Sequence, residues 1–362
     1  MAVYKIFASA DTTLYSSQPK DNAGLDEILE VGVLNSGIPS SVLQAQSADD
    51  IRRSLIQFSN SDIAKINVLS SGSNRAAYLR TYFATADNLS MPYNIEIYPV
   101  SQSWDMGTGK FLDYPPSRNG ACWYTYNGYI AGGTNWSPTS YLYTPGGGSW
   151  YGQKVTQSFG YKDNKDLNVN VTPLVEYWIA SGSNYGFLLK MSSSVEFSTG
   201  SYTRVKYFSV DTHTIYPPTL EMRWDDSSYN TGSLSVVNNN EVTVTVANIM
   251  PVFKNDTAKY TFRVNARDTY PARQFTTSSV YLVNKALPSS SYWAIQDVKT
   301  EEMVIDFDTT YTKISCDSNG NYFNVYMNGL EPERYYKILL KVNLSTGESI
   351  DIDNNNTFKI VR

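Results

Sequence analysis

Residues 168–190, NVNVTPLVEYWIASGSNYGFLLK, predict a strand, a short helix and a second strand. Apolar and polar residues alternate at the start of this stretch, as in a strand with one buried face. Thr172 fits a helix N-cap and Pro173 the first helical position, where the missing N–H costs nothing. Gly182 ends the predicted helix, and residues 185–189 resume an extended apolar run. The stretch therefore predicts a short helix between two strands of a β-rich protein.

The composition of the whole chain also favours strands. Its 362 residues include 29 tyrosines, whereas charged residues make up only 17%. Abundant Tyr, Thr, Ser and Asn with few charges is typical of many short strands joined by polar loops. Tyrosine also supplies rigid, amphipathic contact area, which protein interfaces and sugar platforms both use. The length is sufficient for two or three domains, each with its own core.

The charge pattern and the N-terminus argue against several kinds of partner. The net charge is −5 and no basic block occurs, so we expect no nucleic-acid binding. No stretch approaches the ~18 apolar residues of a membrane span, so we expect no membrane insertion. Residues 1–15 lack the charged and apolar regions of a secretory signal peptide. We therefore expect synthesis in a cytoplasm.

Two domains and one insert can be distinguished along the chain. Residues 1–226 contain dense short strands and predict an N-terminal jelly-roll-like β-sandwich. Within it, residues 104–160 form a looser insert, rich in Gly, Pro and aromatic residues, as functional or contact loops often are. Residues 225–232, DDSSYNTG, are the best linker candidate, and residues 227–362 predict an immunoglobulin-like β-sandwich. The strands expected in the first domain are residues 6–8, 28–31, 53–58, 77–83, 95–100, 185–190, 205–210 and 219–224.

A short motif supports the prediction for the second domain. Leu330-Glu331-Pro332 followed by Tyr336 resembles the corner of immunoglobulin-like and fibronectin-type sandwiches. In that corner a Tyr hydroxyl bonds back to the main chain, so we expect the same hydrogen bond from Tyr336.

Several further motifs in residues 1–226 occur in the order expected of one β-sandwich family. They are Asp11 with Tyr15, Asn22-Ala23-Gly24 with Leu29-Glu30-Val31-Gly32, Arg53 to Phe58 (RSLIQF), Ser103-Trp104-Asp105, Val169 to Thr172 with Trp178, Asn184 to Phe187, and Pro218-Thr219-Leu220. On these motifs the region resembles a DNRLRE-type domain, a module of surface and virion proteins. The hexapeptide that names the family is absent, and Asn170 replaces the usual Asp, so no carboxylate role is carried over to that position.

The arrangement as a whole resembles virion structural proteins of tailed bacteriophages. In these a sandwich with an insert such as SWDMGTGKF (residues 103–111) precedes a C-terminal β-domain. The resemblance implies a non-enzymatic structural protein in the virion, assembled in multiple copies on the neck, tail or capsid. Its partners would be other virion proteins and copies of itself. The alternative is a carbohydrate-binding adhesin or receptor-binding module that contacts a host surface glycan.

The sequence contains no arrangement that predicts catalysis. The single histidine, His213, lies in a loop, and no G-x-S-x-G nucleophile motif occurs. Residues 107–110, GTGK, lack the first Gly and the Ser or Thr of a phosphate-binding loop. Cys122 and Cys316 are far apart in sequence and are expected to be buried free thiols. We expect no enzyme activity and no cofactor, although carboxylate pairs for glycoside cleavage depend on the fold and stay open.

Calcium is the one metal that these residue types leave open. Asp317, Asn319 and Asn321 alternate as at the start of an EF-hand loop, but Tyr322 replaces the required Gly. Asn319-Gly320 alternatively makes a hairpin turn, which is the simpler interpretation. We therefore expect no specific metal site.

Aromatic residues gather in the insert and form the candidate contact site. The cluster comprises Trp123, Tyr124, Tyr126, Tyr129, Trp136, Trp150 and Tyr151. Aromatic loop residues form a glycan-stacking platform, form a protein-docking surface, or cover the edge of the sandwich. The candidate binding residues selected from this cluster are Trp123, Tyr126, Trp136, Trp150 and Tyr151.

Overall fold

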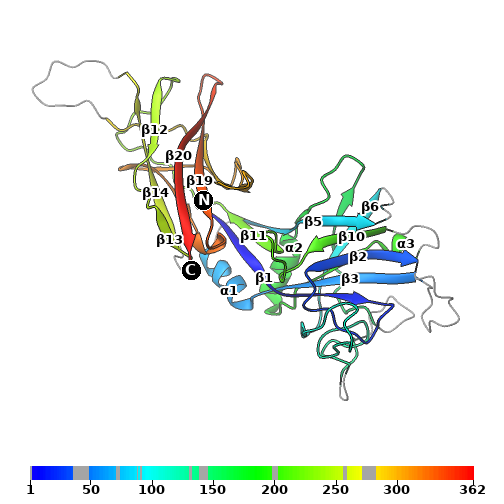
Figure 1. Ribbon diagram of the computed structural model, residues 1–362. Helices are drawn as coiled ribbons and strands as arrows, with labels where there is room; N and C mark the ends of the chain where they lie inside the picture. Colours follow the sequence, from blue (N-terminus) through cyan, green and yellow to red (C-terminus); the bar gives the residue numbers. More distant parts are fainter. Residues whose placement is uncertain are drawn as a thin grey trace, which may run out of the picture. The chain divides into compact units, whose positions relative to one another are not determined.

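The structure is a computed structural model, and it shows an all-β protein, as predicted. By residue contacts the chain divides into two compact units (Figure 1). The N-terminal unit comprises Ile6–Leu69 and Ala76–Glu221; the C-terminal unit comprises Met222–Arg362 with Met1–Lys5 and Ser70–Arg75. The described residues are 2–35, 49–70, 74–87, 89, 92–129, 133–137, 146–197, 203–255, 259–270 and 283–362.

The N-terminal unit is built on an 11-stranded sheet. Its strands are β1 (Ala2–Tyr15), β2 (Ile28–Asn35), β3 (Asp49–Phe58), β4 (Arg75–Thr81), β5 (Phe83–Asp87), β6 (Tyr93–Pro99), β7 (Val155–Phe159), β8 (Leu167–Asn170), β9 (Phe187–Met191), β10 (Thr203–Phe208) and β11 (Thr219–Trp224). One path through the sheet runs β5-β10-β2-β3-β1-β11-β4-β8. A second path leaves β3 through β9 and β6 to β7. All eight strands expected from the sequence are present.

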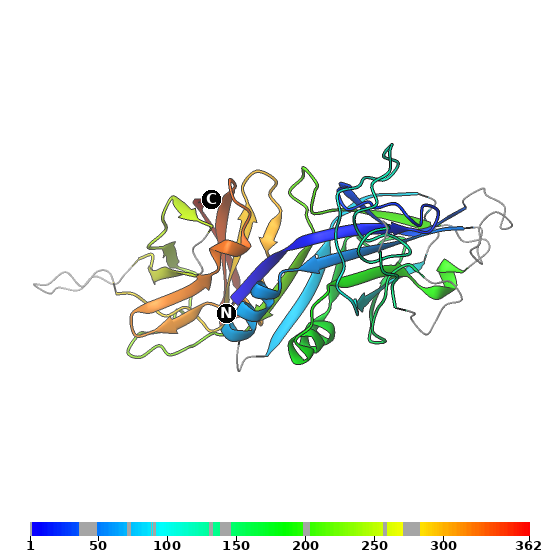
Figure 2. The ribbon, with the colours of Figure 1, turned by 90° about the horizontal axis from the view of Figure 1, so that it is seen from below.

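The branch arises because two strands share one edge of β3. Along one edge β1 pairs with residues 52–58, and the two strands lie side by side in blue in Figure 2. Along the other edge β2 pairs with residues 49–52 and β9 with residues 54–56. Consecutive residues of a strand point to opposite faces, so the side chains of Arg52 and Arg53, at the branch, lie on different faces of the sheet.

The described residues also form three short helices and one 3-10 turn. They are α1 (Asn60–Leu69), α2 (Thr172–Ser181), α3 (Ser193–Glu196) and η1 (Met327–Gly329). Gly182 ends α2 as predicted, with a φ of 70° and an N–H that donates to the Trp178 carbonyl. The predicted N-cap is wrong by one residue, because Val171 occupies that position. The Thr172 hydroxyl instead accepts the N–H of Ala77 in β4 at 2.9 Å, so it joins the helix to the sheet.

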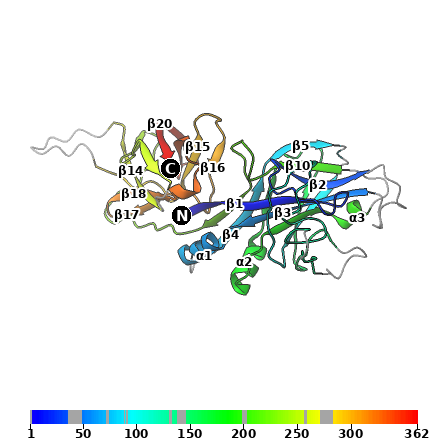
Figure 3. The same cartoon turned by 60° about the horizontal axis from the view of Figure 1, so that its bottom comes forward.

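The C-terminal unit is a sandwich of two sheets. Its strands are β12 (Val242–Val246), β13 (Val252–Lys254), β14 (Tyr260–Asp268), β15 (Ser291–Asp297), β16 (Met303–Ile305), β17 (Ser315–Asp317), β18 (Gly320–Val325), β19 (Tyr335–Asn343) and β20 (Ser349–Val361). One sheet has the order β12-β14-β18-β17 and the other the order β13-β20-β19-β15-β16 (Figure 3). The first order corresponds to the A-B-E-D sheet of an immunoglobulin-type sandwich. The strands β20-β19-β15 of the second correspond to its G-F-C sheet, and β13 and β16 are additional edge strands.

Two side chains strengthen this assignment. Trp293 on β15 is fully buried, as is the Trp of strand C in immunoglobulin domains, and it stacks on Phe323 of β18 with ring centroids 5.1 Å apart. The hydroxyl of Tyr336 donates to the main-chain carbonyl of Glu331 at 3.0 Å, which confirms the predicted tyrosine corner. Ile338 lies where such domains often carry a cysteine, and this core contains no disulfide. Both cysteines are buried free thiols, as predicted.

Candidate contact site on the insert

The buried side chain of Asn22 holds the insert in place by hydrogen bonds. Its Nδ2 donates to the carbonyls of Met106 at 2.8 Å and Ala121 at 2.9 Å. Its Oδ1 accepts the N–H of Gly109 at 2.8 Å. Asn22 is 1% exposed, so these bonds form away from water and hold both sides of residues 106–121.

The hydrogen bonds of Asn22 depend on the glycines of the GTGK stretch. Gly107 has a φ of 77°, and a Cβ there would lie 2.3 Å from Asn22 Oδ1. A Cβ at Gly109 would lie 2.3 Å from the Asn22 carbonyl oxygen. Only glycine fits such close approaches, so the stretch is a structural loop.

Two of the five candidate binding residues belong to the core. Trp123 and Trp136 are 6% and 3% exposed and pack with apolar side chains of β1, β3 and β9, among them Leu14. The Trp136 indole N–H donates to the carbonyl of Cys122 at 2.9 Å, so its polar atom is satisfied internally. Neither ring is accessible to a partner. For these two residues the prediction of a contact surface is corrected: they cover the sheet.

The other three candidates are half-buried and occupy different surroundings. Tyr126 meets Trp136 edge to face, and Trp150 also packs against the covered sheet. Tyr151 instead contacts Tyr177 of α2, with ring centroids 5.1 Å apart. The structure thus brings four of the five candidates into one packed cluster and leaves Tyr151 outside it.

A buried ionic cluster contacts the indole rings of the insert. Arg53 and Glu196 are 1% and 0% exposed and form a two-fold contact, Nε–Oε1 at 3.0 Å and Nη2–Oε2 at 2.9 Å. Arg53 also donates to the carbonyl of Gly147 at 2.9 Å, and its guanidinium lies 5.0 Å from the ring centroid of Trp123. Lys190 contacts the Glu196 carboxylate at 3.2 Å. The charges are therefore satisfied within the fold and join β3, β9, α3 and the insert.

The same cluster continues to Glu96 on β6. Its carboxylate lies 3.6 Å from Lys190, 2.6 Å from Lys154 and 2.9 Å from the hydroxyl of Tyr98. Burial alone would raise the pKa of Glu96, but the bond from Lys154 and the charge of Lys190 outweigh it and hold the pKa below its ordinary value. Glu96 is therefore a paired anion rather than a poised general acid.

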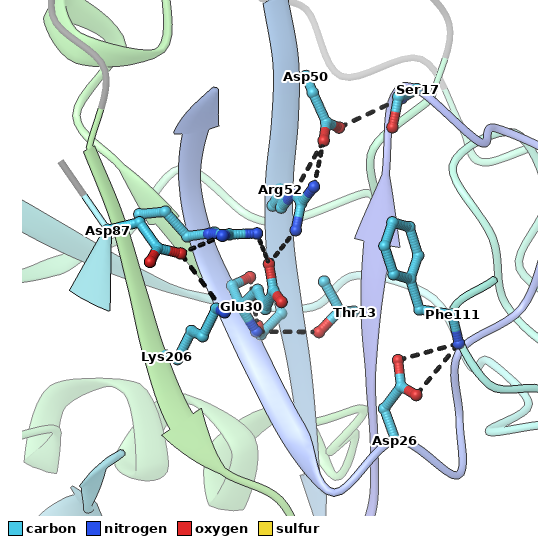
Figure 4. Close-up of polar contacts among 11 residues, drawn as sticks. Thr13, Ser17, Asp26, Glu30, Asp50, Arg52, Asp87, Phe111 and Lys206 are labelled. Atoms are coloured by element: carbon cyan, nitrogen blue, oxygen red, sulfur yellow. Dashed lines mark hydrogen bonds and ion pairs between the residues drawn. The ribbon is translucent and has the colours of Figure 1, made fainter. Parts of the chain in front are cut away.

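A second ionic cluster occupies the other face of β3 (Figure 4). Arg52 lies between two carboxylates: its Nε and Nη2 donate to Asp50 at 2.8 and 2.6 Å, and its Nη1 contacts Glu30. Arg204 on β10 contacts the same Glu30 at 3.2 Å and also pairs with Asp87 of β5. Four neighbouring strands are thus joined by alternating charges.

The Arg52 cluster also packs against Phe111 of the insert. Phe111 stacks on Tyr15 with ring centroids 4.1 Å apart, and the Arg52 guanidinium lies 4.9 Å from the Tyr15 ring and 5.2 Å from the Phe111 ring. The N–H of Phe111 donates to the carboxylate of Asp26 at 3.1 Å (Figure 4). The backbone of the insert is therefore fixed immediately before its exposed tip.

Sequence patterns did not predict this exposed tip. Leu112 and Tyr114 are 70% and 97% exposed. Leu112 has a φ of 67°, in the left-handed region that costs a side chain of this kind about 1 kcal/mol or more. Lys110 and Asp113 close the turn, because the Lys110 N–H donates to the Asp113 carboxylate at 3.0 Å. The available signal was two apolar residues set between charged residues and prolines.

Among the described residues, the remaining sequence candidates do not come together in one site. His213 is exposed, and its Nε2 lies 3.9 Å from Glu27. Asp317 is bound to Arg263 at 2.8 Å and ends the β17–β18 hairpin, which confirms the hairpin interpretation. The amide of Asn321 is used by main-chain groups.

Three further findings bear on possible functions. In the part of the chain that the structure describes, no three His, Cys, Asp or Glu residues form a group that could hold a metal ion. Among those same residues, no helix is both long and apolar enough to cross a membrane. Neither a scan against protein-family models nor a search of curated proteins finds a match, so the DNRLRE-type and phage resemblances remain predictions.

Proposed function

We propose that this chain is a non-enzymatic structural protein of a tailed-bacteriophage particle, assembled in multiple copies on the neck, tail or capsid. We further propose that the insert tip, Leu112 to Pro115, contacts other virion proteins or further copies of the chain. The observation that carries the contact role is the exposure of Leu112 and Tyr114 on a segment fixed by Asp26 and Asn22. A rigid loop loses little conformational freedom on binding, which favours a permanent interface.

The buried indoles favour this role over glycan stacking. A sugar platform needs an accessible aromatic face, and Trp123 and Trp136 present none. The second candidate function, a carbohydrate-binding adhesin, is supported by one other feature: Tyr151 and Tyr177 form a half-buried ring pair at the surface.

Quantitative mass spectrometry of density-banded particles from the source of the gene tests the structural role. The proposal expects stoichiometric recovery, with a copy number that matches a ring or shell symmetry. Absence from the particles would overturn the proposal and favour a free carbohydrate-binding protein.

Complementation with tip variants tests the contact role. We expect L112S/Y114S to fold with unchanged melting temperature and to reduce incorporation into particles at least tenfold. Y161S is the matched control, because Tyr161 is 81% exposed and lies outside the insert. Normal incorporation of the double variant would show that the tip is not an interface. Loss of glycan-array binding in Y151A, with incorporation intact, would support the adhesin instead.

A further inference from the structure

Segments from three parts of the N-terminal unit meet at Asp11. Asp11 lies on β1 and is 1% exposed, and the N–H of Val210, just after β10, donates to its Oδ2 at 2.7 Å. The hydroxyl of Ser209 donates to the main-chain oxygen of Asp26 at 2.5 Å, and the Ser209 N–H to that of Glu27 at 3.0 Å. The segment before β2, the strand β1 and the segment after β10 are thereby joined.

Two carboxylate oxygens at this junction accept no hydrogen bond from any protein group of the described residues. They are Oδ1 of Asp11 and Oδ2 of Asp211, and both atoms are buried. Among the described residues neither side chain forms an ion pair. Buried carboxylate oxygens in native proteins are bound by a protein donor, an ordered water or an ion.

Without a cation, this junction disfavours the charged form of Asp11. Burial, with smaller effects from the charges of Asp211 and Asp26, raises the pKa of Asp11 to about 8, against the hydrogen bond from Val210. Lys110 opposes this effect at Asp26 and at Asp211, but its ammonium is half-exposed and lies 3.8 Å from Glu27. Lys110 is thus shared among Asp26, Glu27 and Asp211, and the exposed His213 also acts on Asp211.

We propose that Asp11 and Asp211 bind a hard, oxygen-seeking cation of the Ca²⁺ class. Ca²⁺ accepts carboxylates, main-chain carbonyls and water in a flexible geometry, whereas Mg²⁺ demands near-ideal octahedral sites. Because only two carboxylates with free oxygens meet here, main-chain oxygens and water complete the coordination. We expect an affinity of about 10⁻⁴ to 10⁻³ M, as in extracellular modules. The bound cation joins β1 to the segments beside β2 and β10, and this inference does not depend on the proposed function.

Calorimetric titration and thermal melting of the full chain with CaCl₂ test the site. After treatment with a chelator, Ca²⁺ should bind with one-site stoichiometry and raise the melting temperature of the N-terminal unit, and equal MgCl₂ should do so at least tenfold less effectively. D11N and D211N should each weaken Ca²⁺ binding at least tenfold. D351N, an exposed acid on β20, is the control and should bind as the unaltered chain does.

Two results would overturn the cation site. One is an unaltered chain that shows no Ca²⁺ binding, together with a D11N variant that is more stable in chelator; Asp11 would then simply carry a proton. The other is undiminished Ca²⁺ binding by D211N, which keeps the test informative if D11N does not fold.

Discussion

Arg53 and Glu196 form an ion pair that water does not reach, and their mutual dependence can be measured. Without Arg53 the buried Glu196 carboxylate keeps Lys190 as a charged partner, so we expect R53M to lower the free energy of unfolding by about 3 kcal/mol, the lower end for a broken buried pair. The double variant R53M/E196L removes both charges while Lys190 keeps Glu96 at 3.6 Å, so it should cost less than R53M alone. Urea denaturation followed by tryptophan fluorescence measures both values. Additive costs would mean that the two side chains act independently.

Glu331, beside the tyrosine corner, makes the stability of the C-terminal unit depend on pH. Burial raises its pKa from 4.5 to about 7, against the opposing charges of Arg334 and Lys5. The folded state therefore holds the proton more tightly than the unfolded chain. This contribution is fully present below pH 4.5 and is lost as the pH rises through 7. Because solvent partly screens this group, we expect the free energy of unfolding to fall by about 1–2 kcal/mol over this range.

Denaturation at several pH values measures this effect. E331Q should flatten the dependence between pH 4.5 and 7. E333Q is the matched control, because the Glu333 side chain is exposed and two positions away. An unchanged slope in E331Q would assign the dependence to other groups.

The hydrogen bonds of Asn22 hold the two sides of the insert together, and an isosteric substitution can weaken them without changing the rest of the fold. N22D places an oxygen where Nδ2 donates to the carbonyls of Met106 and Ala121, so two attractive contacts become repulsive. We expect a loss of about 2–4 kcal/mol of local stability and rapid proteolysis within residues 104–129. N168D, an exposed isosteric change on β8, should leave the digestion pattern unchanged. Cleavage spread evenly over the chain would contradict a local role for Asn22.

The elements themselves could be predicted from the sequence, but their attachments could not. Period-2 patterns, Gly182 and the corner at Tyr336 act over a few residues, and each is confirmed. The Arg53–Glu196 contact joins residues 143 apart, and no local pattern marks it. The misplaced N-cap has the same cause, since the Thr172 hydroxyl bonds to a strand 95 positions away. The aromatic cluster of the insert was visible in sequence, but its burial depends on the sheet that it covers.

At the level of the whole molecule, the first residues of the chain contribute to the core of its C-terminal unit. Val3 is 4% exposed and packs in the same apolar cluster as Trp293 and Phe323. Lys5 Nζ donates to the carbonyl of Val304 at 2.6 Å. The division of the sequence into residues 1–226 and 227–362 places these residues in the other domain, because the first residues of β1 carry no mark of the core they join. Residues 222–362 alone would therefore lack part of their own core.

This interleaving predicts that a substitution at the N-terminus weakens the distant C-terminal unit. V3A deletes two buried methyl groups and should lower the stability of that unit by about 2 kcal/mol. Hydrogen exchange with mass spectrometry should show faster exchange in β15 and β19 and unchanged protection in β3 and β9. V33A removes the same groups from the core beneath the insert, so it should give the reverse pattern. Equal loss of protection in both units for both variants would mean that the chain unfolds as one cooperative body.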